Sequence, residues 1–189
     1  MSLFPSLPAD AHLSDVFKRF PKGLRPLLEL HDALLRDDGA LTIAQRELIA
    51  AYVSGLNGCD FCYGAHTLMA QAFGVEPTLL EALVTDLDAA PVDDRLKPLL
   101  RYLSYLTRTP SRIPRPAIDE VHAAGWSDEA LYEAVSVCAL YNYMNRIVEA
   151  AGLTPGLEYQ NPDDSALKQR RGSTYVQWGE RTGILPPSP

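Results

Sequence analysis

The ten residues from 57 to 66 read NGCDFCYGAH, with two cysteines three positions apart and a histidine four positions after the second. Residues three and four apart share one face of an α-helix, so a helix that begins near Cys59 aligns Cys59, Cys62 and His66. Cα atoms at this spacing are about 5 Å apart, inside the range of about 4.4 to 6.8 Å usual for a disulfide. The stretch therefore predicts a helical thiol pair that can close and reopen.

The start of a helix is also a position that activates a thiol. Unpaired backbone N–H groups there favour the thiolate, and the imidazole of His66 can accept its proton, so we expect Cys62 to be unusually acidic. Glu47 lies in a largely apolar stretch, where an ionised carboxylate is costly without a partner. We predict a hydrogen bond between Glu47 and His66 that fixes the imidazole tautomer and supports proton transfer to or from sulfur.

Helical periodicity continues on both sides of the cysteine pair, and no stretch alternates like a strand. The sequence predicts an all-α multi-helix bundle forming a single domain over 1–189, with the redox motif in 42–74. Residues 1–22 and 154–189 contain many prolines and are interpreted as irregular arms, the second with at most one turn of helix. Helices are expected at 24–35, from 43 to 55–58, from 59 or 60 to 74, and at 77–86, 96–106, 117–124 and 127–152.

Composition excludes several classes of partner. The chain has 189 residues and a formal net charge of -7, which opposes binding to nucleic acid and to anionic membranes. It has no run of about 18 apolar residues and no signal-peptide pattern at its start. Three cysteines do not suit a secreted disulfide scaffold, so we expect a reducing, cytoplasmic location.

Several other residues have side chains that could react or bind a ligand, but simpler interpretations are preferred for them. Cys138 lies on an apolar helical stripe and is predicted to be core. Aromatic side chains at helical spacing can wall a substrate pocket but more often pack, and Asn145 and Arg146 could orient groups near the site or bridge subunits. The remaining histidines and a small basic cluster are expected to be surface or structural; they are His12, His31, His122, Lys168, Arg170 and Arg171.

The order Glu47, Cys59-x-x-Cys62, His66 resembles the signature of the AhpD-like alkylhydroperoxidases, a branch of the carboxymuconolactone decarboxylase superfamily. The helix carrying residues 142–146 resembles that of the peroxidase-related members. The resemblance implies an all-α fold, a homo-oligomer (dimer or hexamer), and peroxide reduction without a metal or other cofactor. It also implies an external dithiol reductant, either lipoyl-bearing or thioredoxin-like.

By the roles in that family, Cys62 is peroxidatic, Cys59 is resolving, and His66 with Glu47 forms the proton relay. Well-studied members often carry a second histidine between the cysteines, where this chain has Asp60-Phe61. The leading hypothesis is a thiol-dependent peroxidase acting on hydrogen peroxide or organic hydroperoxides.

Three alternatives stay open. A general dithiol–disulfide oxidoreductase would use the same pair of thiols on protein disulfides. Zinc could be held by the two cysteines and His66, with Glu47 as the fourth ligand, in a non-enzymatic helical oligomer; we rank this lower because structural zinc sites usually draw on two separated ligand pairs. Lactone decarboxylation, the activity that names the superfamily, would need no cysteine pair.

Overall fold

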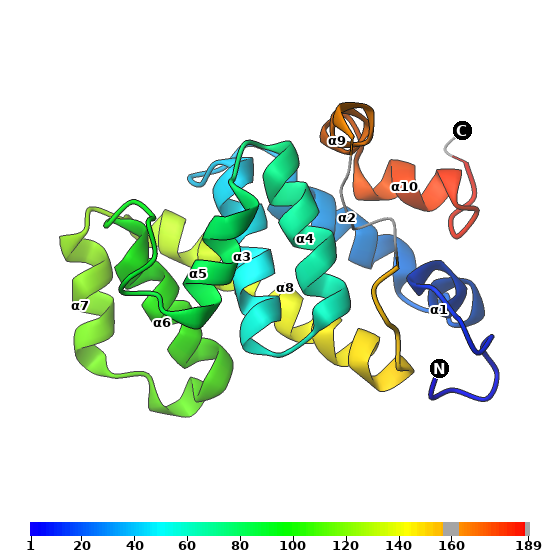
Figure 1. The fold of residues 1–189 in the computed structure, drawn as a ribbon, viewed down its shortest axis with the longest axis horizontal. Helices are drawn as coiled ribbons and strands as arrows, with labels where there is room; N and C mark the ends of the chain where they lie inside the picture. The colour runs from blue at the N-terminus through cyan, green and yellow to red at the C-terminus, as the bar shows by residue number, and fades with distance from the viewer. Residues whose placement is uncertain (157–162, 188–189) are drawn as a thin grey trace.

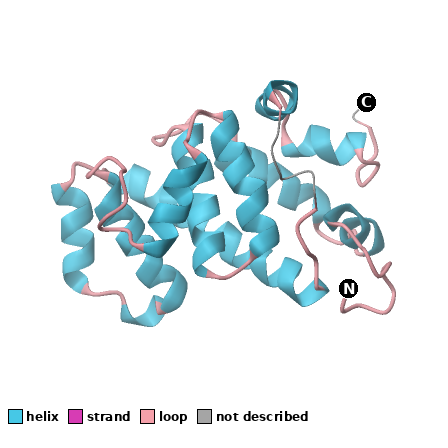
Figure 2. Ribbon diagram, viewed as in Figure 1, coloured by secondary structure: helices cyan, strands magenta, loops and turns pink. Residues whose placement is uncertain are grey.

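The computed structural model describes residues 1–156 and 163–187, and within these ranges the chain is all-α, as predicted, with no strand (Figure 2). A 3₁₀ turn lies at Pro110–Arg112. The helices are α1 (Leu13–Arg19), α2 (Leu24–Leu35), α3 (Ile43–Leu56), α4 (Asp60–Ala72), α5 (Pro77–Thr85), α6 (Leu96–Arg108), α7 (Arg115–Ala123), α8 (Asp128–Ala151), α9 (Asp164–Arg171) and α10 (Tyr175–Arg181).

Helix α3 lies at the centre of the molecule, packed against α4 and α8 (Figure 1). It is apolar on nearly every side, and even Glu47 on it is buried, so neighbouring helices cover it all round. The predicted capping box is present: Thr42 Oγ1 accepts from the backbone N–H of Gln45 at 3.2 Å, and the Gln45 side chain accepts from the backbone N–H of Thr42 at 2.9 Å. A buried central helix places its functional side chains with little freedom.

The other helices form two groups on either side of this centre. Helices α5, α6 and α7 lie at one end, and α1, α2, α9 and α10 lie at the other (Figure 1). Helix α4 contacts α9, and α10 contacts α2, so the end of the chain packs against its beginning. None of the described helices is long and apolar enough to cross a membrane.

The interpretation of residues 1–22 as irregular is wrong for seven of them, because α1 spans Leu13–Arg19. The side chains of His12 and Asp15 form a capping box at its start. Val16 and Phe17 are buried on its inner face. A helix of two turns offers too little periodicity to be recognised among prolines.

The interpretation of residues 154–189 as an extended arm is also wrong in the part that the structure describes, since it contains α9 and α10; 157–162 and 188–189 lie outside the described residues. Asp32 of α2 explains part of the difference. Its carboxylate accepts from the backbone N–H groups of Tyr175 (2.5 Å) and Val176 (3.0 Å), at the start of α10. This contact joins positions more than 140 residues apart, so it leaves no local signal.

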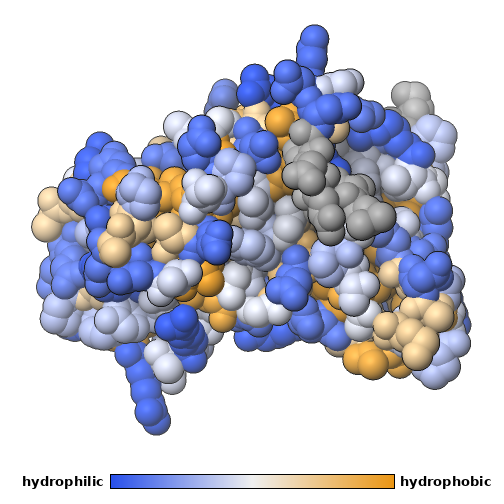
Figure 3. All heavy atoms as spheres, viewed as in Figure 1, coloured by the Kyte–Doolittle hydropathy of each residue, from blue (hydrophilic) through white to orange (hydrophobic). Residues whose placement is uncertain are grey.

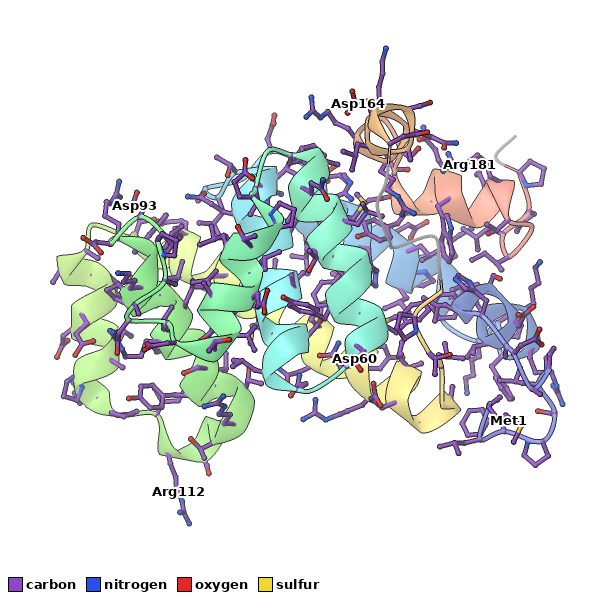
Figure 4. The ribbon with its side chains drawn as sticks, in the orientation of Figure 1. Met1, Asp60, Asp93, Arg112, Asp164 and Arg181 are labelled. Atoms are coloured by element: carbon purple, nitrogen blue, oxygen red, sulfur yellow. The ribbon has the colours of Figure 1, made fainter. Side chains whose placement is uncertain are left out.

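The N-terminal segment carries exposed apolar side chains. Figure 3 shows apolar atoms gathered in the region where Figure 4 labels Met1. Met1 is 92% exposed, Leu3 67% and Phe20 44%. The ring of Phe4 packs edge-on against that of Phe20, with 5.8 Å between centroids. These four residues are called the N-terminal apolar patch below.

Candidate active site

The two cysteines lie at the start of α4. Cys59 is the N-cap residue and Cys62 lies in the first turn. The turn before them needs a left-handed residue, supplied by Gly58 with φ of 67°. The backbone N–H of Cys59 then donates to the carbonyl of Ser54 at 3.0 Å. Both sulfurs are reduced and buried, with Cys59 0% and Cys62 5% exposed.

The two thiols differ in acidity. A hydrogen bond from the Cys59 thiol lowers the pKa of Cys62, and a second from the Asn145 amide lowers it further, although burial and the charge of Glu149 oppose both. The same Cys59–Cys62 bond raises the pKa of Cys59. The lowered pKa of Cys62 agrees in direction with the sequence prediction. The prediction attributed it to the helix start and His66, whereas the groups that lower it are Cys59 and Asn145. Cys62 is therefore the thiol that ionises first.

The predicted hydrogen bond between His66 and Glu47 is present, with 2.6 Å between Nδ1 and Oε2. Arg36 Nη1 donates to the other oxygen, Oε1, also at 2.6 Å. Burial raises the pKa of Glu47, but His66 and Arg36 outweigh it, so that this pKa lies below its ordinary value. The ionised carboxylate holds the His66 proton at Nδ1, which leaves Nε2 as the acceptor in the neutral ring.

Sequence reasoning missed Arg36, which follows the end of α2. Its guanidinium carbon lies 5.0 Å from the ring centroid of Tyr175 and 5.5 Å from that of Phe73. A fully buried, ionised Glu47 needs a positively charged partner, which a neutral imidazole does not supply. The sequence could therefore indicate that a cation lies near Glu47. Nothing in the spacing of the chain indicates which arginine supplies it.

Asn145 of α8, whose use was left open, lies beside the cysteines. It is 1% exposed, its Nδ2 donates to Ser54 Oγ at 3.0 Å, and its Oδ1 accepts from Asn57 Nδ2 at 2.8 Å. These bonds fix the amide that also lowers the pKa of Cys62. Arg146, in contrast, is exposed and donates to the Asn142 carbonyl on its own helix.

A cavity of about 400 Å³ opens in front of Cys62 and His66. Helices α1, α2, α4 and α8 form its floor and walls, and α9 and α10 cover it; Figure 4 labels Asp60 at the start of α4 and Arg181 on α10. Four aromatic side chains near the motif or on the long helix could wall a pocket or simply pack, namely Phe61, Tyr63, Tyr141 and Tyr143, and of these Phe61 and Tyr141 line the cavity. The other lining side chains that matter below are Phe17, Leu28, His31, Arg36, Met144, Arg170, Tyr175 and Trp178.

Three of the simpler interpretations need correction, because His12, His31 and Arg170 all line the cavity. His31 is structural but also lines the cavity: it is 4% exposed, and burial lowers its pKa to about 4. The basic cluster is not merely solvated, because Arg170 lines the cavity and the guanidinium of Arg171 donates to the carbonyl of Ala72. Cys138 is fully buried, as predicted.

The zinc alternative finds no support in the arrangement of these residues. Within 1–156 and 163–187, no group of three or more His, Cys, Asp or Glu side chains is placed to hold a metal ion. Both oxygens of Glu47 are already bound, by Arg36 and by His66. The arrangement instead suits proton transfer next to a reactive sulfur.

Comparison with known proteins bears on the family and the fold. Residues 21–104 match the model of the carboxymuconolactone decarboxylase family. Among solved structures, an uncharacterised peroxidase-related protein from Silicibacter sp. TM1040 is 26% identical, with a TM-score of 0.70 over 78% of each chain. No curated protein matches significantly.

Two further solved structures share the fold at lower identity. A peroxidase-related protein from Ralstonia eutropha JMP134, described as an alkylhydroperoxidase AhpD core, is 22% identical with a TM-score of 0.71, over 77% of this chain and 76% of that one. A debrominase, solved as a cysteine-to-alanine variant with 2,3,4-tribromopyrrole, is 15% identical with a TM-score of 0.68, over 83% of this chain and 81% of that one.

Proposed function

Because the chain is an AhpD-like member of the carboxymuconolactone decarboxylase superfamily, we propose that it is a thiol-dependent peroxidase acting on hydrogen peroxide or small organic hydroperoxides. One observation carries the proposal. Cys62, whose pKa is lowered, lines a cavity together with His66, and a buried, ionised Glu47 holds that histidine. A thiolate in a pocket with a nearby proton acceptor is an arrangement that suits peroxide reduction.

In the proposed cycle, His66 takes the proton of the Cys62 thiol. The sulfur then attacks the distal oxygen of the peroxide, an S–O bond forms, and the O–O bond breaks. The leaving alkoxide takes the proton back from His66, so the products are the Cys62 sulfenic acid and an alcohol. Cys59 condenses with the sulfenic acid, which releases water and gives the Cys59–Cys62 disulfide.

An external dithiol must then reduce this disulfide by exchange. The two sulfurs are almost fully buried, so a narrow group such as a lipoyl arm would reach them more easily than a folded protein surface. The same burial makes a general dithiol–disulfide oxidoreductase acting on protein disulfides the weaker alternative. A thioredoxin-like reductant would need α9 and α10 to move.

Stopped-flow mixing of the reduced protein with cumene hydroperoxide tests the proposal. We expect one Cys59–Cys62 disulfide per equivalent of peroxide, located by alkylation mapping, and no reaction in Cys62→Ser. Cys138→Ser is the matched control, because Cys138 is buried in the core away from the cavity, and it should react like the wild type. Debromination of tribromopyrrole without any reaction with peroxide would contradict the assignment.

A further inference from the structure

Tyr141 of α8 lines the cavity and takes no part in the cycle described above. Its side chain is 1% exposed, and its ring packs edge-on against that of His66, with 4.3 Å between centroids. The ring therefore adjoins the imidazole that handles the proton. It forms part of the wall on which Cys62 and His66 also lie.

The hydroxyl of Tyr141 is buried and makes no hydrogen bond of ordinary length and angle among the described residues, although the phenol of Tyr175 lies near enough to act as a weak partner. Buried polar groups are nearly always paired, because an unpaired one loses its bonds to water without replacement. A poorly paired hydroxyl on the wall of a cavity is therefore a position that a ligand can satisfy. The phenol of Tyr175 also lines the cavity, and both its charge and its weak hydrogen bond raise the pKa of Tyr141, so a ligand would compete with Tyr175 for this hydroxyl.

The protonation state of Tyr141 suits a donor. Burial raises its pKa well above the ordinary value, and the charges of Glu47 and Cys62 act in the same direction. The hydroxyl consequently keeps its proton when Cys62 is a thiolate. It has a hydrogen to offer in a part of the cavity where the sulfur and Glu47 carry negative charge.

We propose that Tyr141 is a further catalytic residue, whose hydroxyl donates a hydrogen bond to the peroxide oxygen that leaves as the alkoxide. The proposal rests on the proposed function of Cys62. As the S–O bond forms and the O–O bond breaks, negative charge develops on the leaving oxygen and the hydrogen bond to it strengthens. His66 still supplies the proton that completes the alcohol, and Tyr141 keeps its own.

The variant Tyr141→Phe removes the hydroxyl and keeps the ring that packs on His66. We expect the second-order rate constant for cumene hydroperoxide to fall about 100- to 1000-fold, the range seen for loss of one donor to a developing oxyanion. The rate of Cys62 alkylation by iodoacetamide, and its pH midpoint, should not change. The melting temperature should change little, because the buried hydroxyl that is removed is only weakly paired with Tyr175.

Tyr52→Phe is the matched control, since Tyr52 is also buried but does not line the cavity. It should leave the peroxide rate unchanged. An unchanged peroxide rate in Tyr141→Phe overturns the proposal, and so does an equal loss of peroxide and iodoacetamide reactivity, which would place the effect on the sulfur. Failure of the proposed function is distinguishable, because the wild type itself would then form no disulfide.

Replacement of Tyr141 by 3-fluorotyrosine gives a second test that does not depend on how the phenylalanine variant folds. The ring and hydroxyl remain, but the fluorinated phenol is more acidic and a stronger donor. We expect a faster reaction with cumene hydroperoxide than in the wild type. A rate equal to or below that of the wild type contradicts donation to the leaving oxygen.

Discussion

Burial fixes the charge of His31 and with it part of the pH dependence of stability. Its Nδ1 donates to the carbonyl of Leu27 at 2.7 Å, and its ring lies 4.9 Å from that of Tyr175, measured between centroids. Burial disfavours the charged imidazolium and lowers the pKa of His31 from 6.5 to about 4. At neutral pH the ring is therefore uncharged and cannot pair with Glu47 as a cation.

We predict that the free energy of unfolding falls as the pH drops from about 6.5 to about 4. In that window the unfolded chain binds a proton at His31 and the folded chain does not, so stability rises with pH, by roughly 3 kcal/mol in total for this group. Urea titrations across the window measure the slope. His31→Phe should flatten it.

The control for this prediction is His122→Asn, which removes a more exposed histidine that pairs with Asp128. His122→Asn should leave unchanged the rise of the free energy of unfolding between about pH 4 and pH 6.5. An identical slope in the wild type and in His31→Phe would show that other groups carry the pH dependence.

At the scale of residues, spacing along the chain could predict only the local part of the site. Cys59, Cys62 and His66 share one helix, and Glu47 lies on the helix just before it, so helical periodicity and burial were enough to select them. The other side chains at the site come from distant positions that no spacing rule connects. They are Arg36, His31, Tyr141 and Asn145.

At the scale of elements, α10 depends on a close approach at Gly179. A Cβ atom there would lie 2.7 Å from Leu28 Cδ1 and 3.1 Å from two carbons of Leu185. Glycine thus lets the cover of the cavity sit directly on α2. The docking of α10 is a tertiary effect, and the local signal is limited to the capping box of Thr174 and Gln177 on a helix too short to show a period.

We predict that Gly179→Ala loosens the cover. Overpacking of this kind costs about 1 to 3 kcal/mol, which should show as faster hydrogen exchange in α10 and faster alkylation of Cys62 by a bulky maleimide. Gly172→Ala is the matched control, because the nearest atom to its Cβ is 3.7 Å away. Equal behaviour of the two variants would mean that α10 does not limit access to Cys62.

Most of the other helices could be predicted because each carries its own signals. The capping box at Thr42 starts α3, Ser127 caps α8, and Gly152 with φ of 68° ends it. Helices α1, α9 and α10 are short, and their apolar positions are too few to define a period. Their stability comes from caps and from contacts with the rest of the chain.

At the scale of the whole molecule, the N-terminal apolar patch leaves hydrophobic surface in water. A second copy of the same chain can cover such surface and remove it from water. The homo-oligomer expected from the family resemblance stays a prediction. The patch is where we expect the contact.

We predict that the protein is an oligomer at micromolar concentration. Phe20→Asp should lower the molar mass of the particle in solution, because a carboxylate buried in the contact would oppose association. Light scattering coupled to size exclusion measures this. Tyr132→Asp is the control, since Tyr132 is 75% exposed on α8 and outside the patch. A monomeric wild type would exclude the oligomer, and an oligomeric Phe20→Asp would move the contact elsewhere.

Arg36 links the cover of the cavity to the charge inside it. One face of its guanidinium lies against Tyr175 at the start of α10, while its Nη1 holds the carboxylate that orients His66. If α10 lifts away, water reaches that cation, and a hydrated cation attracts Glu47 less strongly. His66 would then be held less firmly by Glu47 whenever α10 is displaced. Proton transfer by His66 is therefore favoured when α10 lies over a cavity that already contains the substrate.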